Sequence, residues 1–329
     1  MSRTVLVTGG AGYIGSHVCK LLAETESTPI TYDTLEKGHD WAVRWGPLER
    51  GDIGDADRLD EVIARHRPNA VIHLAGYIEV GESVRQPERY FHNNTMKSHV
   101  LIDIMLRHGV DTLVFSSTCA VYGLPQTELI AETHPIAPLS PYAESKARVE
   151  RAMAAAAGRG LRSAALRYFN AAGADSNGEI GEAHDPETHL LPLAADAALG
   201  LGPALTLLGD DYATPDGSCI RDFVHVSDLA DAHVRALGWL QRRSGEGHYE
   251  TFNLGSGSGH SVQQVIAETG RIAGCTVPHR VGPRRPGDSP KLVGDIGKTT
   301  RELGWRPTRN LTVQIEDTMR WRRKLQRAK

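Results

Sequence analysis

The ten residues 8–17, TGGAGYIGSH, decide the predicted fold, because they hold three glycines in the spacing G-x-x-G-x-x-G. A short β-branched run at residues 4–8 precedes them, and the apolar residues that follow recur with the period of an amphipathic helix. These helical positions are Ile14, Val18, Leu21 and Leu22. Glycines at a strand-to-helix turn let the backbone approach a pyrophosphate, which the free N–H groups of the helix start attract. The stretch therefore predicts a dinucleotide site, with a purely structural glycine turn as the alternative.

Asp33 adds a second part of this predicted site. It ends the next predicted strand, 18 residues after Gly15, near the roughly 20 residues expected for a carboxylate that binds a ribose hydroxyl. A carboxylate at that place would repel a 2′-phosphate. We therefore expect NAD, and not NADP, as the cofactor.

Strand-like and helix-like segments alternate through the first half of the chain. Further strands are predicted at residues 29–33, 70–75, 112–118 and 163–170, with helical patterns between them. This order predicts an α/β fold with a doubly wound parallel sheet (Rossmann), because parallel strands need helical crossovers that cover both faces.

A polar, glycine-bearing stretch after about residue 174 predicts a second, smaller α/β domain that holds the substrate. We predict the dinucleotide-binding domain over residues 1–175, with returns near 218–240 and 250–275. The substrate domain is predicted over residues 176–329, so the two domains are interleaved along the chain.

The composition is that of an ordinary globular protein. Of its 329 residues, 40% are hydrophobic and 23% charged, and the formal net charge is −3. This balance argues against nucleic acid as a partner and favours a small molecule. The sequence predicts neither a membrane helix nor a secretory signal. Because the four cysteines form no CxxC pair, we expect a cytoplasmic protein.

Two clusters that could bind ligands have simpler interpretations. The glycines within residues 255–259 precede Ser261 and Gln264, a capping-box pattern that favours a strand-to-helix turn over a second phosphate site. His184 and His189 do not have the i, i+4 spacing of a helical metal pair. We therefore expect a loop with turn and capping residues there, and no metal.

A tyrosine and a lysine form the predicted catalytic pair. Tyr142 and Lys146 lie four residues apart in the helical pattern of SPYAESKARVE, residues 140–150, so their side chains would share one helix face. A nearby ammonium favours the phenolate and can lower the pKa of a tyrosine towards neutrality, where it can accept a hydroxyl proton. Thr118 ends a predicted strand shortly before them, at the edge where an open α/β sheet binds its ligand.

Several motifs together resemble the extended short-chain dehydrogenase/reductase superfamily, and within it the UDP-glucose 4-epimerase family. The first four are TGGAGYIG, SSTCAVYG, PYAESK and RYFNAAGA. Further segments follow in the order of that family: HLLPL, GDDYATPDGSCIRDFVHVSDLADAH, NLGSGSGHSV and RRPGD. The resemblance covers nearly the whole chain, and several of its segments belong to sugar-nucleotide binding and not to NAD binding in general.

The resemblance implies a reversible interconversion of UDP-glucose and UDP-galactose in which NAD stays bound. Tyr142, as phenolate, would remove the proton of the 4-hydroxyl while hydride passes from carbon 4 to the nicotinamide. The transient 4-keto sugar would turn and take the hydride back on its other face, which inverts carbon 4. Thr118 would hydrogen-bond the same hydroxyl, and Lys146 would hold the nicotinamide ribose. A homodimer through helices near residues 87–108 and 140–158 is also implied.

The resemblance further assigns binding residues. Positions that match the NAD site are Gly9, Gly12, Tyr13, Ile14, Gly15, Asp33, Thr34, Asp52, Ile53, Leu74, Ala75, Gly76, Asn94, Tyr142, Lys146 and Phe169. Positions that match the UDP-sugar site are Thr118, Tyr142, Asn170, His189, Leu190, Leu208, Arg221, Arg285 and Asp288. The two arginines would offer forked donors to the pyrophosphate. From the residues alone, Arg221 could instead pair with Asp222, and Asn170 could satisfy a strand end.

Three positions depart from the family pattern. Ile78 stands where the family often has a lysine directed towards the cofactor phosphates, so that cation is missing. Leu208 stands where an aromatic side chain often stacks on uracil. Leu292 occupies the position that restricts the sugar pocket when it is a tyrosine, so N-acetylated sugars are open as substrates.

Other functions stay open from the sequence. An epimerase of UDP-N-acetylhexosamine or UDP-pentose would use the same chemistry. A sugar-nucleotide 4,6-dehydratase shares the fold but needs an acid after the active-site threonine, where this chain has Cys119 and Ala120. Ala120 also counts against related decarboxylases, which usually keep a glutamate there. A non-catalytic NAD-binding regulator is the alternative of another class, and such proteins typically lose the Tyr–Lys pair.

Overall fold

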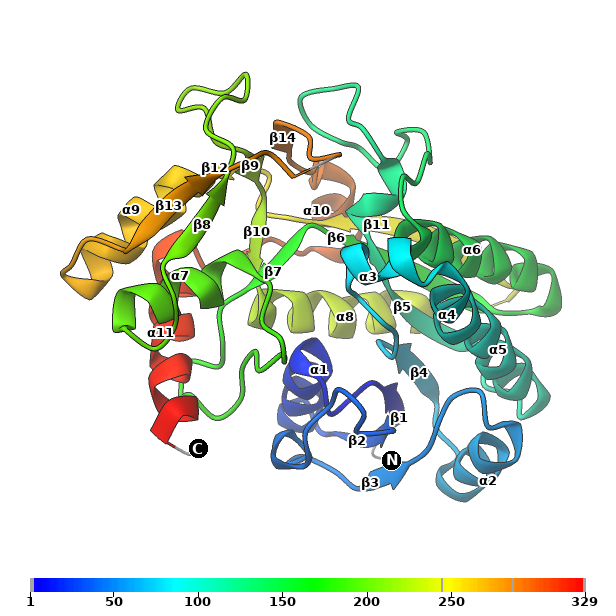
Figure 1. The fold of residues 1–329 in the computed structure, drawn as a ribbon. Helices are drawn as coiled ribbons and strands as arrows, with labels where there is room; N and C mark the ends of the chain where they lie inside the picture. The colour runs from blue at the N-terminus through cyan, green and yellow to red at the C-terminus, as the bar shows by residue number, and fades with distance from the viewer. Residues whose placement is uncertain (1–2, 244, 286, 328–329) are drawn as a thin grey trace.

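A seven-stranded parallel sheet forms the centre of the protein in the computed structural model, which describes residues 3–243, 245–285 and 287–327. Its strands are β1 (Arg3–Thr8), β2 (Ser27–Asp33), β3 (Leu48–Arg50), β4 (Ala70–His73), β5 (Thr112–Thr118), β6 (Arg162–Tyr168) and β11 (His248–Leu254). Their order is β11-β6-β5-β4-β1-β2-β3, and all neighbours pair in parallel (Figure 1). The predicted doubly wound α/β fold is confirmed. Its winding reverses between β1 and β4, where such sheets bind ligands.

Helices cover both faces of this sheet. They are α1 (Tyr13–Glu24), α2 (Ala56–His66), α5 (Lys97–Arg107), α6 (Pro141–Ala156) and α8 (Val226–Gln241). Successive residues of a strand point to opposite faces, so Val5 and Val7 of β1 pack with α1 and α8, whereas Leu6 packs with α2, α5 and α6. All three side chains are completely buried. Burial of each contributes about 1.5–3 kcal/mol, which makes this strand the anchor of both layers.

The predicted strands differ from the observed ones mainly at their ends. Residues 4–8, 29–33 and 112–118 lie within β1, β2 and β5. The strand predicted at 70–75 stops at His73. The one predicted at 163–170 divides at Phe169, where β6 gives way to β7 (Asn170–Ala172). Strand β7 leaves the main sheet because it pairs with β10 (Phe223–His225) instead.

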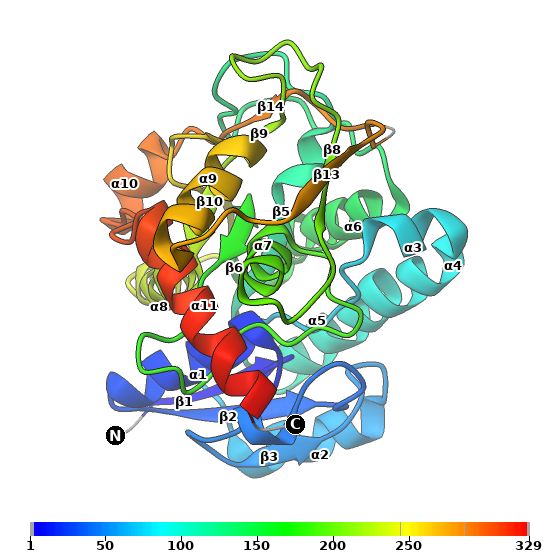
Figure 2. The same cartoon turned by 60° about the vertical axis from the view of Figure 1, so that its left-hand side comes forward.

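The second half of the chain builds smaller sheets and helices beside the main sheet. Its described elements are α7 (Leu190–Leu199), β8 (Leu205–Leu208), β9 (Ile220–Arg221), β12 (His260–Ser261), α9 (Val262–Ala273), β13 (His279–Gly282), β14 (Lys291–Leu292), α10 (Gly297–Leu303) and α11 (Leu311–Arg327). Helices α7, α9 and α11 gather with β8 and β13 on one side, away from α5 and α6 (Figures 1 and 2). Helix α8 packs on α1, and β11 pairs with β6, so the chain returns twice to the main sheet. The predicted domain boundaries stay a prediction.

Local capping explains where the functional helices begin. Helix α6 starts with Ser140 as its N-cap, whose hydroxyl accepts the Ala143 N–H, and with Pro141 in its first turn. Helix α9 starts with the predicted capping box of Ser261 and Gln264, so the glycines before it form a strand-to-helix turn. Within the described residues, no helix has the length and apolar character needed to cross a membrane.

Candidate active site

The glycine turn between β1 and α1 forms the first wall of the candidate site. Gly9 has φ +72°, and a Cβ there would lie 2.6 Å from the backbone nitrogen of Ala75. A Cβ at Gly15 would lie only 2.1 Å from the carbonyl oxygen of Gly9. Gly12 is the N-cap of α1 and offers no side-chain cap, so the first N–H groups of the helix are free for an anion. The turn therefore fits the pyrophosphate of a dinucleotide.

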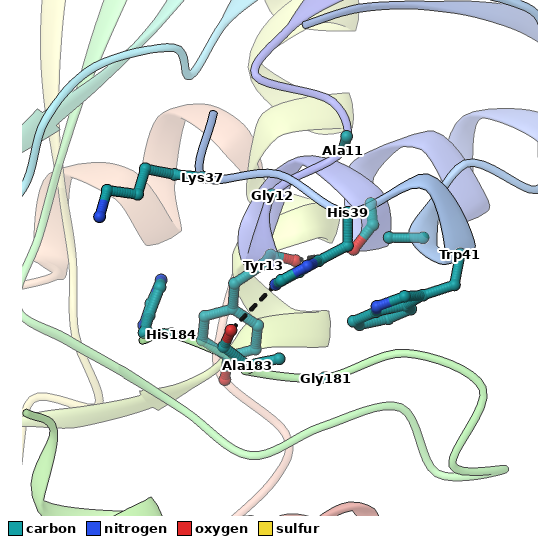
Figure 3. A pocket seen from close by; sticks show the side chains of 11 residues that line it. Ala11, Gly12, Tyr13, Lys37, His39, Trp41, Gly181, Ala183 and His184 are labelled. Carbon is teal, nitrogen blue, oxygen red and sulfur yellow. Dashed lines mark hydrogen bonds between the residues drawn. The ribbon is translucent and has the colours of Figure 1, made fainter. Parts of the chain in front are cut away.

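A pocket lies directly at this helix start. It is lined by Ala11, Gly12, Tyr13, Ser16, Lys37, His39, Trp41, Ala42, Gly181, Ala183 and His184 (Figure 3). His39 Nε2 lies 2.9 Å from the carbonyl oxygen of Ala183, and the Tyr13 hydroxyl donates to the carbonyl oxygen of Gly173 at 2.6 Å. These contacts fix the loop before α7 over the glycine turn. Lys37, His39 and Trp41 follow β2 without any recognisable motif, so the sequence does not predict them as part of the site.

Asp33 lies against the glycine turn, where its predicted role requires it. Its Oδ2 accepts the N–H of Ala11 at 3.1 Å, and its Oδ1 accepts the N–H of Leu35 at 2.9 Å. Burial raises the pKa of Asp33, although these backbone hydrogen bonds act in the opposite direction. Thr34 follows, and its Oγ1 accepts the N–H of Glu36 at 3.2 Å. The acid is therefore positioned by backbone donors before any ligand binds.

Asn94 connects the second wall of the site to the catalytic helix. It lies in the π-helical segment η2 (Phe91–Met96), a type of helix that is frequent at functional sites. Its side chain bonds both the N–H and the carbonyl of Tyr77, at 2.8 and 3.0 Å, and donates to the Ser145 hydroxyl of α6 at 3.1 Å. A Cβ at Gly76 would lie 3.2 Å from Asn94 Oδ1 and 3.4 Å from Lys146 Nζ. Gly76, Asn94 and Lys146 therefore lie together.

The other predicted NAD residues make contacts within the chain. The Lys97 ammonium donates a hydrogen bond to Asp52 Oδ2 at 2.5 Å. Ile53 belongs to the core between β1 and α2. Phe169 is buried in one cluster with Cys119 and Ala147, the sequence neighbours of Thr118 and Lys146. The remaining three residues, Ile14, Leu74 and Ala75, pack against the two hydrophobic clusters that flank the main sheet.

The predicted acid–base group is assembled from β5 and α6. Thr118 ends β5, and its Oγ1 accepts the N–H of Ala120 at 3.1 Å. Lys146 is buried, and its Nζ donates to the carbonyl oxygen of Ser116 at 3.0 Å. The same ammonium lies 4.9 Å from the ring centre of Phe115. The hydroxyl of Thr118 also lies close enough to the Tyr142 phenol to lower its pKa.

The expected lowering of the Tyr142 pKa by Lys146 is not found in the chain alone. Burial raises the pKa of Tyr142 to about 12, and the hydrogen bond from Thr118 offsets only part of this rise. Burial also lowers the pKa of Lys146 to about 8, so its charge is easily lost. The four-residue spacing predicts a shared helix face but not where the ammonium points, and here it bonds the backbone of β5.

Replacing Thr118 with valine is expected to move the acid limb of the pH–rate profile to higher pH. The hydroxyl lowers the pKa of Tyr142, so its loss raises that pKa and leaves less phenolate at neutral pH. A hydrogen bond to a charged group contributes about 1.5–3 kcal/mol, which corresponds to a shift of about 1–2 pH units. Turnover measured between about pH 6 and 10 tests this. Thr118→Ser keeps a hydroxyl and should keep the parental profile. An unshifted acid limb in Thr118→Val would contradict the assignment of Thr118 as the group that lowers the pKa of Tyr142.

Several predicted UDP-sugar residues meet near β9. Arg221 Nη2 lies 3.3 Å from Asp288 Oδ1, and the N–H of Asp288 donates to the carbonyl oxygen of Arg285 at 3.2 Å. The alternative Arg221–Asp222 ion pair is wrong for the described residues, because the buried Asp222 carboxylate instead accepts backbone N–H groups such as that of Gly294, at 3.1 Å. Leu208 ends β8 beside Gly282 of β13.

Asn170 and the start of α7 complete the predicted set. Asn170 donates through Nδ2 to the carbonyl oxygen of Asp222 at 3.0 Å, so it does satisfy a strand end. His189 is the N-cap of α7 and Leu190 its first residue. His189 Nδ1 lies 2.8 Å from Glu182 Oε1, and no described contact joins it to Arg221 or Asp288.

The structure also shows the surroundings of the positions that depart from the family pattern. Leu292 packs on the cluster that contains Cys119 and Phe169, beside the catalytic group. Burial raises the pKa of Cys119 to about 12, so this thiol is a poor proton donor at neutral pH. Ile78 is 40% exposed.

Comparison with known proteins shows the family of this chain. The model of the NAD dependent epimerase/dehydratase family matches residues 5–255. The chain belongs to this family. A relative from Rhizobium meliloti (strain 1021), named UDP-glucose 4-epimerase, is 47% identical over 323 residues, which cover 97% of each chain.

Solved structures of members of the epimerase/dehydratase family are similar over nearly the whole chain. The structure of UDP-glucose 4-epimerase from Brucella ovis in complex with NAD is 44% identical, has a TM-score of 0.93, and covers 97% of this chain and 98% of its own. The UDP-Glc/GlcNAc 4-epimerase from Campylobacter jejuni is 35% identical with a TM-score of 0.85, covering 98% of this chain and 100% of its own.

Proposed function

We propose that the chain is an NAD-dependent isomerase that inverts carbon 4 of a UDP-hexose, so that UDP-glucose and UDP-galactose interconvert. The observation that carries this proposal is that Thr118 acts on the pKa of Tyr142, while Lys146 lies beside Gly76, whose neighbour Ala75 contacts Gly9 of the glycine turn. The high identity to proteins named UDP-glucose 4-epimerase supports the same reaction.

The glycine turn and the start of α1 fit the pyrophosphate of NAD, and Asp33 fits its ribose. Bound NAD supplies the hydride acceptor for carbon 4 and a positive charge at its nicotinamide ring. Without that charge, the pKa of Tyr142 stays at about 12. Tyr142 therefore becomes a phenolate near neutral pH only in the loaded protein, which links its basicity to the presence of the cofactor.

In the proposed reaction, the Tyr142 phenolate takes the proton of the sugar 4-hydroxyl as the carbon–hydrogen bond at carbon 4 breaks. The Thr118 hydroxyl holds the same oxygen and relays the proton. Lys146 holds the nicotinamide ribose. The uridine nucleotide is held by Asn170, His189, Leu190, Leu208, Arg221, Arg285 and Asp288. Arg221 would then exchange its ion pair with Asp288 for the pyrophosphate, which a guanidinium can bind with two parallel donors.

The purified protein incubated with UDP-galactose, without added cofactor, tests this function. We expect UDP-glucose to form, because the enzyme carries its NAD from the cell. Failure to convert any UDP-sugar when NAD is also supplied would overturn the proposal.

Two other reactions are disfavoured by the same residues. A 4,6-dehydratase needs an acid after Thr118, but Cys119 has a raised pKa of about 12 and Ala120 carries no acid. A regulator without catalysis has no need of the Tyr142–Lys146 pair, which this chain keeps.

Replacing Leu292 with tyrosine is expected to remove activity on UDP-N-acetylglucosamine while sparing UDP-glucose. Leu292 packs beside the catalytic group, so a larger ring there would fill the space needed by an N-acetyl group. A pocket change of this kind is expected to change the preference about 10- to 200-fold. The ratio of kcat/KM for UDP-glucose, UDP-N-acetylglucosamine and UDP-xylose measures it. An unchanged ratio would show that position 292 does not limit the pocket.

We propose that the enzyme is a cytoplasmic homodimer. Met96 of η2 exposes 57% of its surface within the helical region 87–108, and Arg148 of α6 lies 4.3 Å from the Phe91 ring. All four cysteines are free thiols, which favours a reducing compartment. Light scattering that gives the mass of one chain would contradict the dimer.

A further inference from the structure

Four ionisable side chains converge on one point in the loop before α7, outside the acid–base group. They are Glu182, His184, Glu187 and His189, and one donor atom of each lies within 4.8 Å of the other three. The spacing of the two histidines does not suit a helical metal pair. The two glutamates nevertheless complete a set of four, because the loop curls back on itself.

The contacts place two imidazole rings against one carboxylate oxygen. His184 Nδ1 lies 3.0 Å from Glu182 Oε1, and His189 Nδ1 lies 2.8 Å from the same atom. Glu187 Oε1 lies 3.1 Å from His189 Nδ1. The side chains of Glu182 and Glu187 are only 5% and 8% exposed. Two carboxylates are thus removed from water at one place, with no lysine or arginine among these contacts.

Hydrogen bonding within the chain leaves this cluster incomplete. His184 Nδ1 and Glu187 Oε2 are both buried, and neither has a hydrogen-bond partner among the described residues. His184 Nδ1 is close to Glu182 but lacks the alignment of a hydrogen bond. Arg322, a neighbouring cation on α11, is bound by Asp196 through its Nε at 2.7 Å. Unsatisfied buried atoms are unusual in native proteins, and a missing ion is one physical reason for them.

We propose that Glu182, His184, Glu187 and His189 bind one divalent cation, for which zinc is the best match. Two ring nitrogens and two carboxylate oxygens form a set that suits zinc, whereas magnesium and calcium prefer oxygen ligands alone. The charge also fits, because two carboxylates balance a divalent cation when both imidazoles are neutral. Because His189 is shared with the proposed uridine-nucleotide site, this proposal is tested by zinc binding and not by turnover.

The cation would hold the wall of the cofactor pocket. His184 lines that pocket, and its ring packs edge-on against Tyr13 of α1, with 6.4 Å between ring centres (Figure 3). The carbonyl oxygen of Glu182 accepts the indole N–H of Trp321 on α11 at 2.8 Å. One ion would therefore tie the loop to the start of α7 and stabilise its packing on α1 and α11.

Zinc titration of the purified, chelator-treated protein tests the site. We expect one zinc ion per chain, measured by competition with a chromophoric chelator, and visible absorption typical of tetrahedral cobalt when cobalt replaces zinc. His184→Ala and the nearly isosteric Glu187→Gln should each weaken zinc binding at least about 10-fold. His279→Ala removes an exposed histidine of β13 and should leave binding unchanged.

Circular dichroism of each variant shows whether it is folded, and Glu187→Gln keeps the test valid if His184→Ala is not. Absence of saturable zinc binding to the parent protein would mean that the four side chains are held by hydrogen bonds and ion pairs alone, which overturns the proposal. Zinc that binds equally well to the parent, His184→Ala and Glu187→Gln would lie elsewhere and would also overturn it.

Discussion

Tyr142→Phe is expected to lose at least about 100-fold in turnover while it keeps NAD bound. The variant removes only the phenol oxygen, and general acid–base groups contribute about 10²–10⁴-fold to enzymatic rates. The ring itself stays, so the packing of α6 and the glycine turn should be unaffected. The conversion of UDP-galactose to UDP-glucose measures turnover, and the NAD released on denaturation measures cofactor content.

Tyr249→Phe is the matched control for this change. The Tyr249 hydroxyl donates to Glu150 at 3.1 Å on the outermost strand of the sheet, and it takes no part in the proposed reaction. It should retain turnover within a few-fold of the parent. A near-parental rate in Tyr142→Phe, or an equal loss in Tyr249→Phe, would contradict the assignment of Tyr142 as the base.

Gly15→Ala is expected to weaken NAD binding strongly and to destabilise the fold. The added methyl would lie 2.1 Å from the carbonyl oxygen of Gly9 and 2.8 Å from the Cα of Gly10. Both neighbours are backbone atoms, so the whole turn must shift. Overpacking of this kind costs about 1–3 kcal/mol, which corresponds to about a 5- to 150-fold loss when the shifted turn is the binding site.

Gly158→Ala provides the control, because an added Cβ there meets no atom within 4 Å. It should leave both NAD content and the midpoint of denaturant unfolding unchanged. Comparison of the two variants separates steric crowding of the turn from a general effect of losing a glycine. Full NAD occupancy in Gly15→Ala would show that the close approach of α1 to β1 is not needed for binding.

The sequence predicts the layers of the fold well where a local pattern decides the structure. Three consecutive residues before Gly9, Val5–Val7, are apolar, so they indicate a strand that is buried on both faces. Strand β3 was missed because its three residues include Glu49 and Arg50. Glu49 is buried only because Arg58, Arg65 and His66 of α2 pair with it. A pattern of single residues cannot indicate such compensation.

In the candidate site, too, the sequence predicts what local patterns decide and not what tertiary contacts decide. Thr118, Tyr142 and Lys146 are predicted from a strand end and a helical spacing, both of which are local signals. The contact of His39 with Ala183 joins segments 144 residues apart, so no local pattern could reveal it. The direction of the Lys146 ammonium depends on the carbonyl of Ser116, a tertiary contact that the helical spacing does not predict. Burial, which also depends on tertiary packing, raises the pKa of Tyr142 instead of lowering it.

Strand β11 pairs with β6, although β11 begins 248 − 168 = 80 residues after β6 ends. During synthesis on the ribosome, β6 therefore emerges long before its outer neighbour, and it presents unpaired backbone groups that favour aggregation. The cofactor-binding layer can be completed only after α7, β8 and β9 of the second half of the chain have been made. A chain released before residue 248 should consequently be a substrate for chaperones and proteases, and not a smaller NAD-binding protein.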